Sequence, residues 1–290
     1  MYVFKAAVVG AGTMGGEIAQ VIASSGIPVV LKDMKQEFVE TGLTKAREVT
    51  EAQLKGLVDK EKITREQADT QLGEVTGRIT GTTEYEGFGD VDFVVEAVPE
   101  RIQIKQAVFA ELDEVTPGHA ILASNTSSLA ISRMAEATSR PDRVVGFHFF
   151  YPASMMRLIE VIEGEETSEE TLQTATTFAQ QVRKTPIRCG EGPGFVVNRI
   201  LISAVSEVWR ATHEGGLDVK EVDKVIQESG TAPIGPFYLT DLLGLDTVLH
   251  VAEHLHESYG ERFFVSPAMK ELVQTGDLGQ KTGKGFYEHG

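Results

Sequence analysis

The chain has 290 residues, more than one hydrophobic core usually holds, and its hydrophobic content of 41% is typical of a globular protein. A formal net charge of −16 argues against non-specific binding to nucleic acid or to an anionic membrane surface, because both need clustered cations. Cys189 is the one cysteine, so no internal disulfide can form and a reducing compartment is expected. No apolar run approaches the ~20 residues that span a membrane, and the first residues predict a strand rather than a signal peptide. We therefore expect a cytoplasmic protein of two domains with no nucleic-acid or membrane partner.

The first predicted strand, residues 4–10, runs directly into the glycine-rich sequence GAGTMG, and a helix follows over 14–25. The first glycine permits a tight turn, the second lets the backbone approach a pyrophosphate, and the third permits close packing of helix and strand. The N-terminus of the helix then faces the phosphates. The pattern predicts a dinucleotide site, the alternative being a tight turn without a ligand. The residues expected to form it are Gly10, Ala11, Gly12, Thr13, Met14 and Gly15.

A second strand is predicted over residues 27–33, and Asp33 ends it about 20 residues after the glycine-rich turn. An acid in this place binds the 2′-hydroxyl of a ribose and repels a 2′-phosphate, so NAD(H) is favoured over NADP(H). Two helical segments then follow, near 36–56 and 64–74, joined by the charged stretch DKEKIT.

Buried strands are predicted over 91–99, 120–127 and 143–150, and their alternation with helices indicates a mostly parallel sheet covered on both faces. Ligands of such sheets bind off the carboxyl ends of the strands. The polar residues expected near that edge are Glu96, Glu100, Ser127, Ser128 and His148. The alternative for each serine is a helix N-cap, and for Glu100 a solvated loop.

Two ionisable residues stand in apolar runs: His148 within GFHFF, and Glu160 within RLIEVI. In a strand, Glu160 shares a face with Leu158 and Ile162, where an ionised carboxylate is costly unless it is paired. His148 is a candidate partner, and the alternative is two unrelated residues, one in the core and one at an edge.

After residues 185–195 the pattern becomes helical, which predicts a dinucleotide domain over 1–186 and a helical domain over 187–290. No metal site is expected, because His250 and His254 stand four apart without an HExxH motif, and a solvated helix face explains them. The absence of a GxSxG sequence argues against acyl hydrolysis.

Taken together, these stretches resemble the L-3-hydroxyacyl-CoA dehydrogenase family over nearly the whole chain. The matching segments, in order, are GAGTMGGEIAQV, VVEAVPE, ASNTSSL, GFHFFYPASMMRLIEVI, GPGFVVNRIL, IGPFYLTDLLGLD and KTGKGFY. The resemblance implies an α/β Rossmann-type domain with a helical hairpin insertion, followed by a smaller all-α C-terminal domain that commonly forms a homodimer. It also implies NAD as cofactor and oxidation of a 3-hydroxyacyl-CoA to the 3-ketoacyl-CoA, in fatty-acid β-oxidation or butanoate metabolism.

The resemblance assigns roles to individual positions. His148 matches the general base of the family and Glu160 its partner, while Ser127 and Asn198 match residues that position the substrate. The family's further cofactor contacts match Glu100, Lys105, Ser127 and Lys281. The hairpin at 36–74 matches the region that meets CoA. Candidates there for its phosphates are Lys55, Lys60 and Lys62, which solvated helix charges also explain.

One position departs from the family, which commonly has asparagine where Tyr151 stands. Tyrosine is larger and has only a hydroxyl, so this residue bears on local geometry and substrate preference. Two other functions stay open from the sequence: a related dehydrogenase of a free hydroxy or sugar acid, and a non-catalytic dinucleotide-binding protein. The sequence leaves open the acyl-chain length and whether the chain belongs to a larger multifunctional enzyme; short chains are expected.

Overall fold

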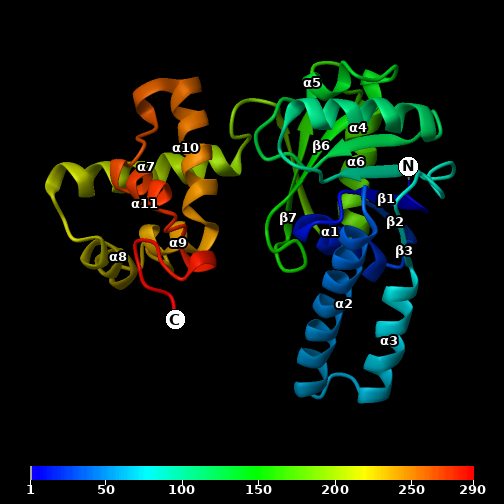
Figure 1. Cartoon of the computed structure of the whole chain (residues 1–290), viewed down its shortest axis with the longest axis horizontal. Coiled ribbons are helices and arrows are strands. Elements are labelled where there is room, and N and C mark those ends of the chain that lie inside the picture. Colours follow the sequence, from blue (N-terminus) through cyan, green and yellow to red (C-terminus); the bar gives the residue numbers. More distant parts are fainter. Residues whose placement is uncertain (1) are drawn as a thin grey trace. The chain divides into compact units, whose positions relative to one another are not determined.

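The computed structural model describes residues 2–290, which divide between Glu191 and Gly192 into two compact units. The first unit is built on one eight-stranded sheet, and the second is helical (Figure 1). The predicted class, an α/β Rossmann-type domain followed by an all-α domain, is confirmed. Within residues 2–290, no helix combines the length and the apolar character needed to cross a bilayer.

The sheet has the strand order β3-β2-β1-β4-β5-β6-β7-β8. Its strands are β1 (Ala6–Val9), β2 (Val29–Lys32), β3 (Ile79–Thr82), β4 (Phe93–Glu96), β5 (Ile121–Ser124), β6 (Val144–Phe149), β7 (Leu158–Glu163) and β8 (Thr185–Gly190). All neighbours pair in parallel except β6 and β7, which are antiparallel. The chain moves outward from β1 in one direction and resumes at β4 in the other. The carboxyl ends of β1 and β4 therefore border the crevice in which such sheets bind ligands.

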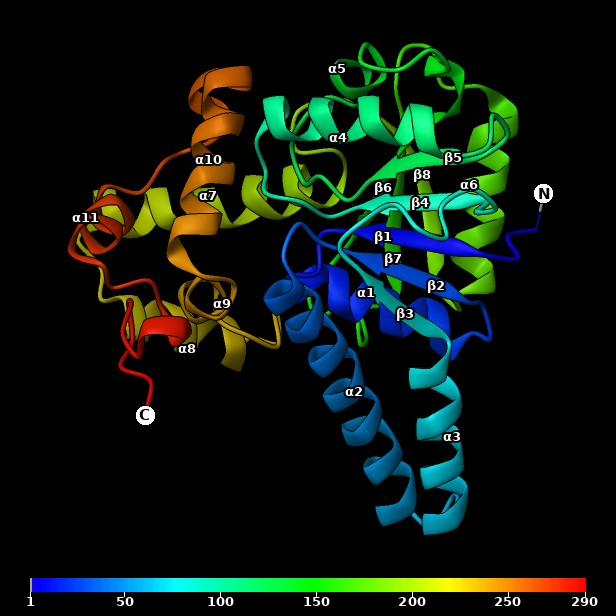
Figure 2. The ribbon, with the colours of Figure 1, turned by 45° about the vertical axis from the view of Figure 1, so that its right-hand side comes forward.

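Helices cover both faces of this sheet. Those of the first unit are α1 (Thr13–Ser24), α2 (Gln36–Asp59), α3 (Arg65–Gly77), α4 (Ile102–Val115), α5 (Ile131–Ala135) and α6 (Glu169–Gln181), with a short 3-10 turn over Pro141–Arg143. Residues of α1 and α6 share one core cluster with the sheet, while α4 and α5 lie on the opposite face (Figure 2). Aromatic packing closes this core, because the ring of Phe93 lies 5.2 Å from Phe147 and 4.5 Å from Phe178.

The pair α2 and α3 projects away from the sheet as a helical hairpin (Figure 2). Thr64 begins α3 with a capping box, in which its side chain accepts from Gln67 N and the Gln67 side chain accepts from Thr64 N. Only a narrow row of α2 is buried, at Val39, Gly42, Ala46, Thr50 and Leu54. The rest of the hairpin surface is left for solvent or a ligand.

The sequence did not predict the two edge strands, β3 and β8, for a physical reason. β3 consists of the residues ITGT, which have no apolar run, and β8 consists of TPIRCG, which is partly exposed. Pro186 cannot donate to a ladder, and edge strands are where a sheet tolerates proline. A strand that is covered on one side only does not need the apolar pattern by which buried strands are recognised.

The second unit packs its helices around Trp209 and Phe263, which are buried together with Leu245 and Met269. Its helices are α7 (Val197–Gly215), α8 (Val219–Glu228), α9 (Pro236–Leu243), α10 (Leu245–Tyr259) and α11 (Pro267–Thr275), with 3-10 turns over Gly260–Arg262 and Gln280–Thr282.

Asp241 on α9 anchors the last residues of the chain. Its fully buried carboxylate accepts from Phe286 N and Tyr287 N, both at 2.9 Å, and lies 2.8 Å from His289 Nε2. A buried carboxylate with three such partners is a large contribution to the stability of a small helical unit.

We predict that Asp241→Ala destabilises the second unit by on the order of 3 kcal/mol, because it leaves buried N–H donors without an acceptor. Trp209 is the one tryptophan of the chain, so its fluorescence during urea unfolding reports on this unit. As a control, Asp218→Ala removes an exposed N-cap of α8 and should cost about 1 kcal/mol. An equal, small effect of both variants would contradict the anchoring role.

Candidate active site

The parallel pairing brings the carboxyl ends of four strands to one edge of the sheet. Val9 is opposite Glu96, Glu96 is opposite Ser124, and Ser124 is opposite Gly146. The glycine-rich turn, the residues after β4, the residues after β5, and His148 therefore all lie along this edge. The segments come from positions up to 138 residues apart in the chain, counted from Gly10 to His148 (148 − 10).

The antiparallel pairing of β6 and β7 sets His148 directly opposite Glu160. His148 Nδ1 lies 2.8 Å from Glu160 Oε2, the distance of a strong hydrogen bond. The carboxylate is fully buried, and His148 is 6% exposed. The ring of Phe150 lies 4.6 Å from the imidazole and adds an apolar wall. A buried carboxylate at Nδ1 holds the imidazole in one orientation and stabilises its protonated form by charge.

A buried ion-pair network lies at the neighbouring strand ends. Lys105 Nζ, on α4, lies 2.7 and 3.0 Å from the two oxygens of Glu96 and 3.2 Å from Glu100. The lysine is 1% exposed and Glu96 is fully buried, whereas the Glu100 side chain is 32% exposed. Ser124 Oγ completes the network by donating to Glu96 at 2.6 Å. Glu100 is thus the member of the network that faces the crevice.

Glu100 in turn organises the residues after β5. Thr126 Oγ1 donates to Glu100 Oε1 at 2.5 Å, Ser127 N donates to it at 3.0 Å, and Ser128 Oγ lies 3.3 Å from it. Burial raises the pKa of the Glu100 carboxyl, but the Lys105 charge and the hydrogen bonds from Thr126 and Ser127 outweigh that effect, and the pKa lies below its ordinary value. Glu100 is therefore ionised and holds Ser127 at the edge.

Sequence reasoning placed Lys105 against the cofactor and missed its two carboxylate partners. In the structure the ammonium is enclosed, so that it acts on the crevice through Glu100. Sequence reasoning also missed Asn125, whose Oδ1 accepts from Phe149 N at 2.8 Å and ties the loop after β5 to the strand of His148. A glutamate ending an apolar strand, with a lysine nine residues later, is the signal that could have revealed the ion pair.

The glycine-rich turn fits a dinucleotide. Gly10 has φ +102°, and a Cβ there would lie 2.6 Å from the Ala97 carbonyl carbon; a Cβ on Gly15 would lie 1.7 Å from Gly10 O. Gly12 is different, because a Cβ there meets no protein atom within 4 Å. Gly12 also caps α1 without a side-chain hydrogen bond, so the helix N-terminus faces open space suited to a pyrophosphate.

Asp33 accepts from Ala11 N and Met34 N, both at 2.7 Å, which fixes this carboxylate beside the turn.

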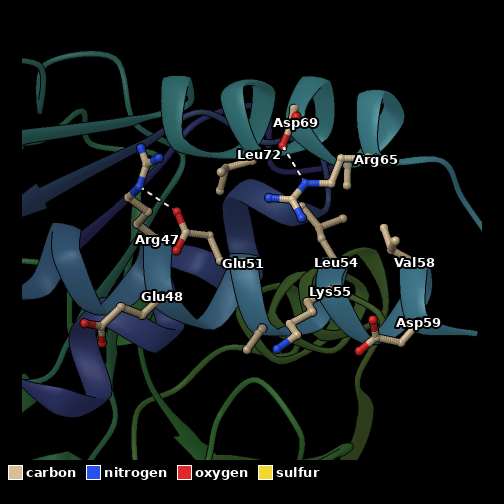
Figure 3. A pocket seen from close by; sticks show the side chains of 12 residues that line it. Arg47, Glu48, Glu51, Leu54, Lys55, Val58, Asp59, Arg65, Asp69 and Leu72 are labelled. Atoms are coloured by element: carbon tan, nitrogen blue, oxygen red, sulfur yellow. Dashed lines mark ion pairs between the residues drawn. The ribbon is translucent and has the colours of Figure 1, made fainter.

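The remaining predicted residues lie on the loops, on the hairpin and in the second unit. Tyr151 is 57% exposed in the β6–β7 connection. Lys55 lines a cavity of about 650 Å³ between α2 and α3, where Arg47 pairs with Glu51 and Arg65 with Asp69 (Figure 3). Lys60 and Lys62 are exposed near the tip of the hairpin.

In the second unit, Asn198 lies in the first turn of α7, and Lys281 Nζ pairs with Asp246. No cluster of three or more metal-ligating side chains occurs among residues 2–290.

Comparisons with known proteins agree with this geometry. The family model described as 3-hydroxyacyl-CoA dehydrogenase, NAD binding domain, matches residues 5–192, and the model of the C-terminal domain of the same family matches 194–289. A probable 3-hydroxybutyryl-CoA dehydrogenase of Deinococcus radiodurans is 42% identical over 286 residues, which cover 98% of this chain and all of that protein. The fatty acid oxidation complex subunit alpha of a Psychrobacter species is 41% identical over 287 residues, but these cover only 38% of its length.

Two crystal structures are close to this chain in fold and sequence. The (S)-3-hydroxybutyryl-CoA dehydrogenase PaaH1 of Ralstonia eutropha superposes with a TM-score of 0.90 at 36% identity, covering 99% of both chains. FadB2 of M. tuberculosis superposes with a TM-score of 0.91 at 34% identity, covering both chains completely.

Two glycine substitutions test the role of the turn. Gly12→Ala should fold normally, because its Cβ meets no protein atom, but should weaken NADH binding by roughly tenfold or more, because the methyl occupies the approach of the pyrophosphate. Gly15→Ala should instead lower the thermal unfolding midpoint, because its Cβ overlaps a backbone carbonyl. Fluorescence titration with NADH and thermal unfolding measure the two effects. Wild-type NADH affinity of Gly12→Ala would refute the assignment.

Proposed function

The chain belongs to the 3-hydroxyacyl-CoA dehydrogenase family, and from this premise we propose how its residues divide the work of the reaction. The protein is an NAD-dependent enzyme that oxidises a 3-hydroxyacyl-CoA to the 3-ketoacyl-CoA, reversibly. The observation that carries the proposed mechanism is the 2.8 Å contact between His148 Nδ1 and the buried carboxylate of Glu160.

His148 is the proposed general base. When bound, NAD supplies the acceptor for the hydride that leaves C3 of the substrate. The 3-hydroxyl must lose its proton in the same conversion, and an imidazole titrates close enough to neutral pH to take it. With Nδ1 held by Glu160, Nε2 is the atom assigned to receive the proton. The carboxylate stabilises the imidazolium that results, as in the catalytic triad of serine proteases, but with no nucleophile.

The other predicted site residues keep their assignments as proposals. Ser127 is assigned to the substrate hydroxyl, and its placement by the ionised Glu100 supports this role. Asn198 is assigned to the thioester side of the substrate, and Lys281 to the cofactor. The first turn of α1 and Asp33 would hold the dinucleotide, and Glu100 with Lys105 behind it would face the nicotinamide end.

Substrate size is a separate proposal. We assign the enzyme to short chains such as 3-hydroxybutanoyl-CoA, in fatty-acid oxidation or butanoate metabolism, because proteins named for that substrate align over their full length. We also propose that it works in the cytoplasm, where its lone Cys189 stays reduced.

A chain-length series measures this preference. We expect kcat/KM to be highest with acetoacetyl-CoA and NADH, and to fall as the 3-ketoacyl chain is lengthened. Free acetoacetate serves as the control and should be a far poorer substrate, because it lacks the CoA moiety. Equal turnover of the free acid and of its CoA ester would instead favour a dehydrogenase of free hydroxy acids.

A homodimer through the second unit is also proposed. Large apolar side chains of this unit are exposed: Ile200 on α7 at 66%, Val225 on α8 at 64%, and Leu217 in the connection between these helices at 55%. Exposed apolar side chains of this size on a helical unit favour association. Light scattering at micromolar concentration should give the mass of a dimer, and Ile200→Glu should shift it towards the monomer. A wild-type monomer under these conditions would overturn the proposal.

The catalytic pair is tested by Glu160→Gln. The amide keeps the shape of the carboxylate but loses its charge and can select the wrong tautomer of His148, so turnover should fall on the order of 10²–10³-fold. Glutamine has the same shape as glutamate and fits the same buried position, so NADH affinity should stay near that of the wild type. Turnover of acetoacetyl-CoA with NADH, measured beside NADH binding, gives the result.

Coupling between the two residues adds a second criterion. His148→Ala should lose at least as much activity as Glu160→Gln, and the double variant should lose little more, because residues that act as a unit are not additive. Losses that multiply in the double variant would mean that the two side chains act independently. Near-wild-type turnover of Glu160→Gln would reduce the carboxylate to a structural role.

A further inference from the structure

A second cavity of the first unit is lined by cations and by no carboxylate. It has a volume of about 260 Å³, and its walls come from α1, α2, the β6–β7 connection and the residues that follow α6. Its charged residues are Arg157, Arg183 and Lys184. The cavity of the hairpin, by contrast, carries four carboxylates beside its cations. In a chain with 43 acidic and 27 basic residues, a cavity lined only by basic and neutral groups is a local reversal of the overall charge.

We call this cavity, with its charged residues Arg157, Arg183 and Lys184, the arginine cavity. Its two arginines differ from most others in the chain because they have no acidic partner among residues 2–290. Arg140 and Arg188 pair with Asp113 and Glu169, as the negative net charge leads one to expect. The guanidinium groups of Arg157 and Arg183 make no ion pair or hydrogen bond with another residue of the described chain, 2–290. Both donor forks are therefore available to a ligand.

Arg183 also stands where the backbone favours glycine. Its φ is +61°, and it directly follows the cap of α6, with Arg183 N donating to Gln180 O and Lys184 N donating to Ala179 O. This is the left-handed C′ position of a helix end, which glycine occupies most often because a Cβ is disfavoured there. An arginine held at a backbone cost is a reason to look for a function of its side chain.

The cavity adjoins the loop that leaves the catalytic strand. Lys184 Nζ donates to Ala153 O at 2.6 Å and to Met156 O at 2.7 Å, and Ser154 N donates to the buried Glu17 on α1 at 3.2 Å. The loop thus forms one wall of the cavity, and it begins within three residues of His148. A ligand whose reacting carbon lies at His148 can extend along this loop towards the arginines.

A neutral acceptor in the same cavity is also without a donor. Gln20 is 1% exposed, its Nε2 donates to Ser24 and Gln53, and its Oε1 has no partner. A buried amide oxygen without a hydrogen bond is costly. The oxygen itself is enclosed by the protein, so Gln20 belongs to the wall of the cavity and is not a contact for a ligand.

We propose that the arginine cavity binds the phosphate groups of the CoA moiety, with Arg157 and Arg183 as the phosphate ligands. The inference rests on the proposed function, since it assumes an acyl-CoA at His148. CoA carries a diphosphate and a 3′-phosphate, which guanidinium groups bind bidentately. Local cations of this sort are what a protein of net charge −16 needs to hold a polyanion.

The test compares two thioesters in two variants. Arg183→Gly removes the guanidinium and suits the positive φ, so its thermal unfolding midpoint should not fall, and Arg157→Gln removes the other charge. Each variant should raise KM for acetoacetyl-CoA by about five- to tenfold. KM for acetoacetyl-pantetheine, which has no phosphate, and affinity for NADH should not change. Arg183→Lys should recover part of the loss, and Arg188→Gln, outside the cavity, is the matched control.

The outcomes separate this inference from the proposed function. An unchanged KM for acetoacetyl-CoA, or an equal rise for both thioesters, would overturn the phosphate site while leaving the dehydrogenase in place. Titration of CoA alone by calorimetry is independent of turnover, and weaker binding to the variants than to Arg188→Gln is expected. A wild-type protein that binds CoA through these arginines but reduces no 3-ketoacyl-CoA would sink the proposed function alone. The dephospho-CoA thioester assigns the contact: a loss that persists with it belongs to the diphosphate, and one that vanishes belongs to the 3′-phosphate.

Discussion

The antiparallel register of β6 and β7 is the constraint on which the proposed active site depends. It places a histidine opposite a glutamate in the interior of a sheet whose other neighbouring strands are parallel. An ionised carboxylate in that position is costly unless it is hydrogen-bonded, and the imidazole supplies the hydrogen bond. A shift of β7 by one residue would turn Glu160 to the opposite face of the sheet, away from His148. The connection between the two strands, which forms one wall of the arginine cavity, therefore helps to set the geometry of the proposed catalytic pair.

The second buried charge cluster solves a similar problem in another way. The ammonium group of Lys105 compensates the charge of the fully buried Glu96. It also forms an ion pair with Glu100, which is partly exposed. The cost of burying these groups is offset only because every member has several hydrogen-bond partners. The result is a carboxylate that stays ionised and holds the residues after β5 in place. Breaking one member leaves the others as unpaired buried charges, so the network behaves as a unit.

The sheet edge explains why distant segments cooperate. Parallel strands end at the same edge, and the reversal of strand order between β1 and β4 opens a crevice there. The dinucleotide turn, Glu100 and Ser127 follow β1, β4 and β5, and His148 lies in β6, the next strand of the sheet. The hairpin α2–α3 and the β6–β7 connection extend from the same unit, which gives a CoA-sized ligand more surface than the catalytic edge alone.

The sequence by itself determined those features that are local: the glycine-rich turn between a strand and a helix, the acid that follows β2, the alternation of strands with helices, and ionisable residues inside apolar runs. Each rests on spacing along a few residues, where propensity and periodicity act directly. Only the tertiary structure decided which distant residues meet. Lys105 pairs with Glu96 because α4 folds back on β4. The edge strands β3 and β8 form because β2 and β7 have backbone groups free to hydrogen-bond with them. The arginine cavity combines four segments of the chain. Such contacts depend on crossovers and register between segments far apart in sequence, and these carry no local pattern.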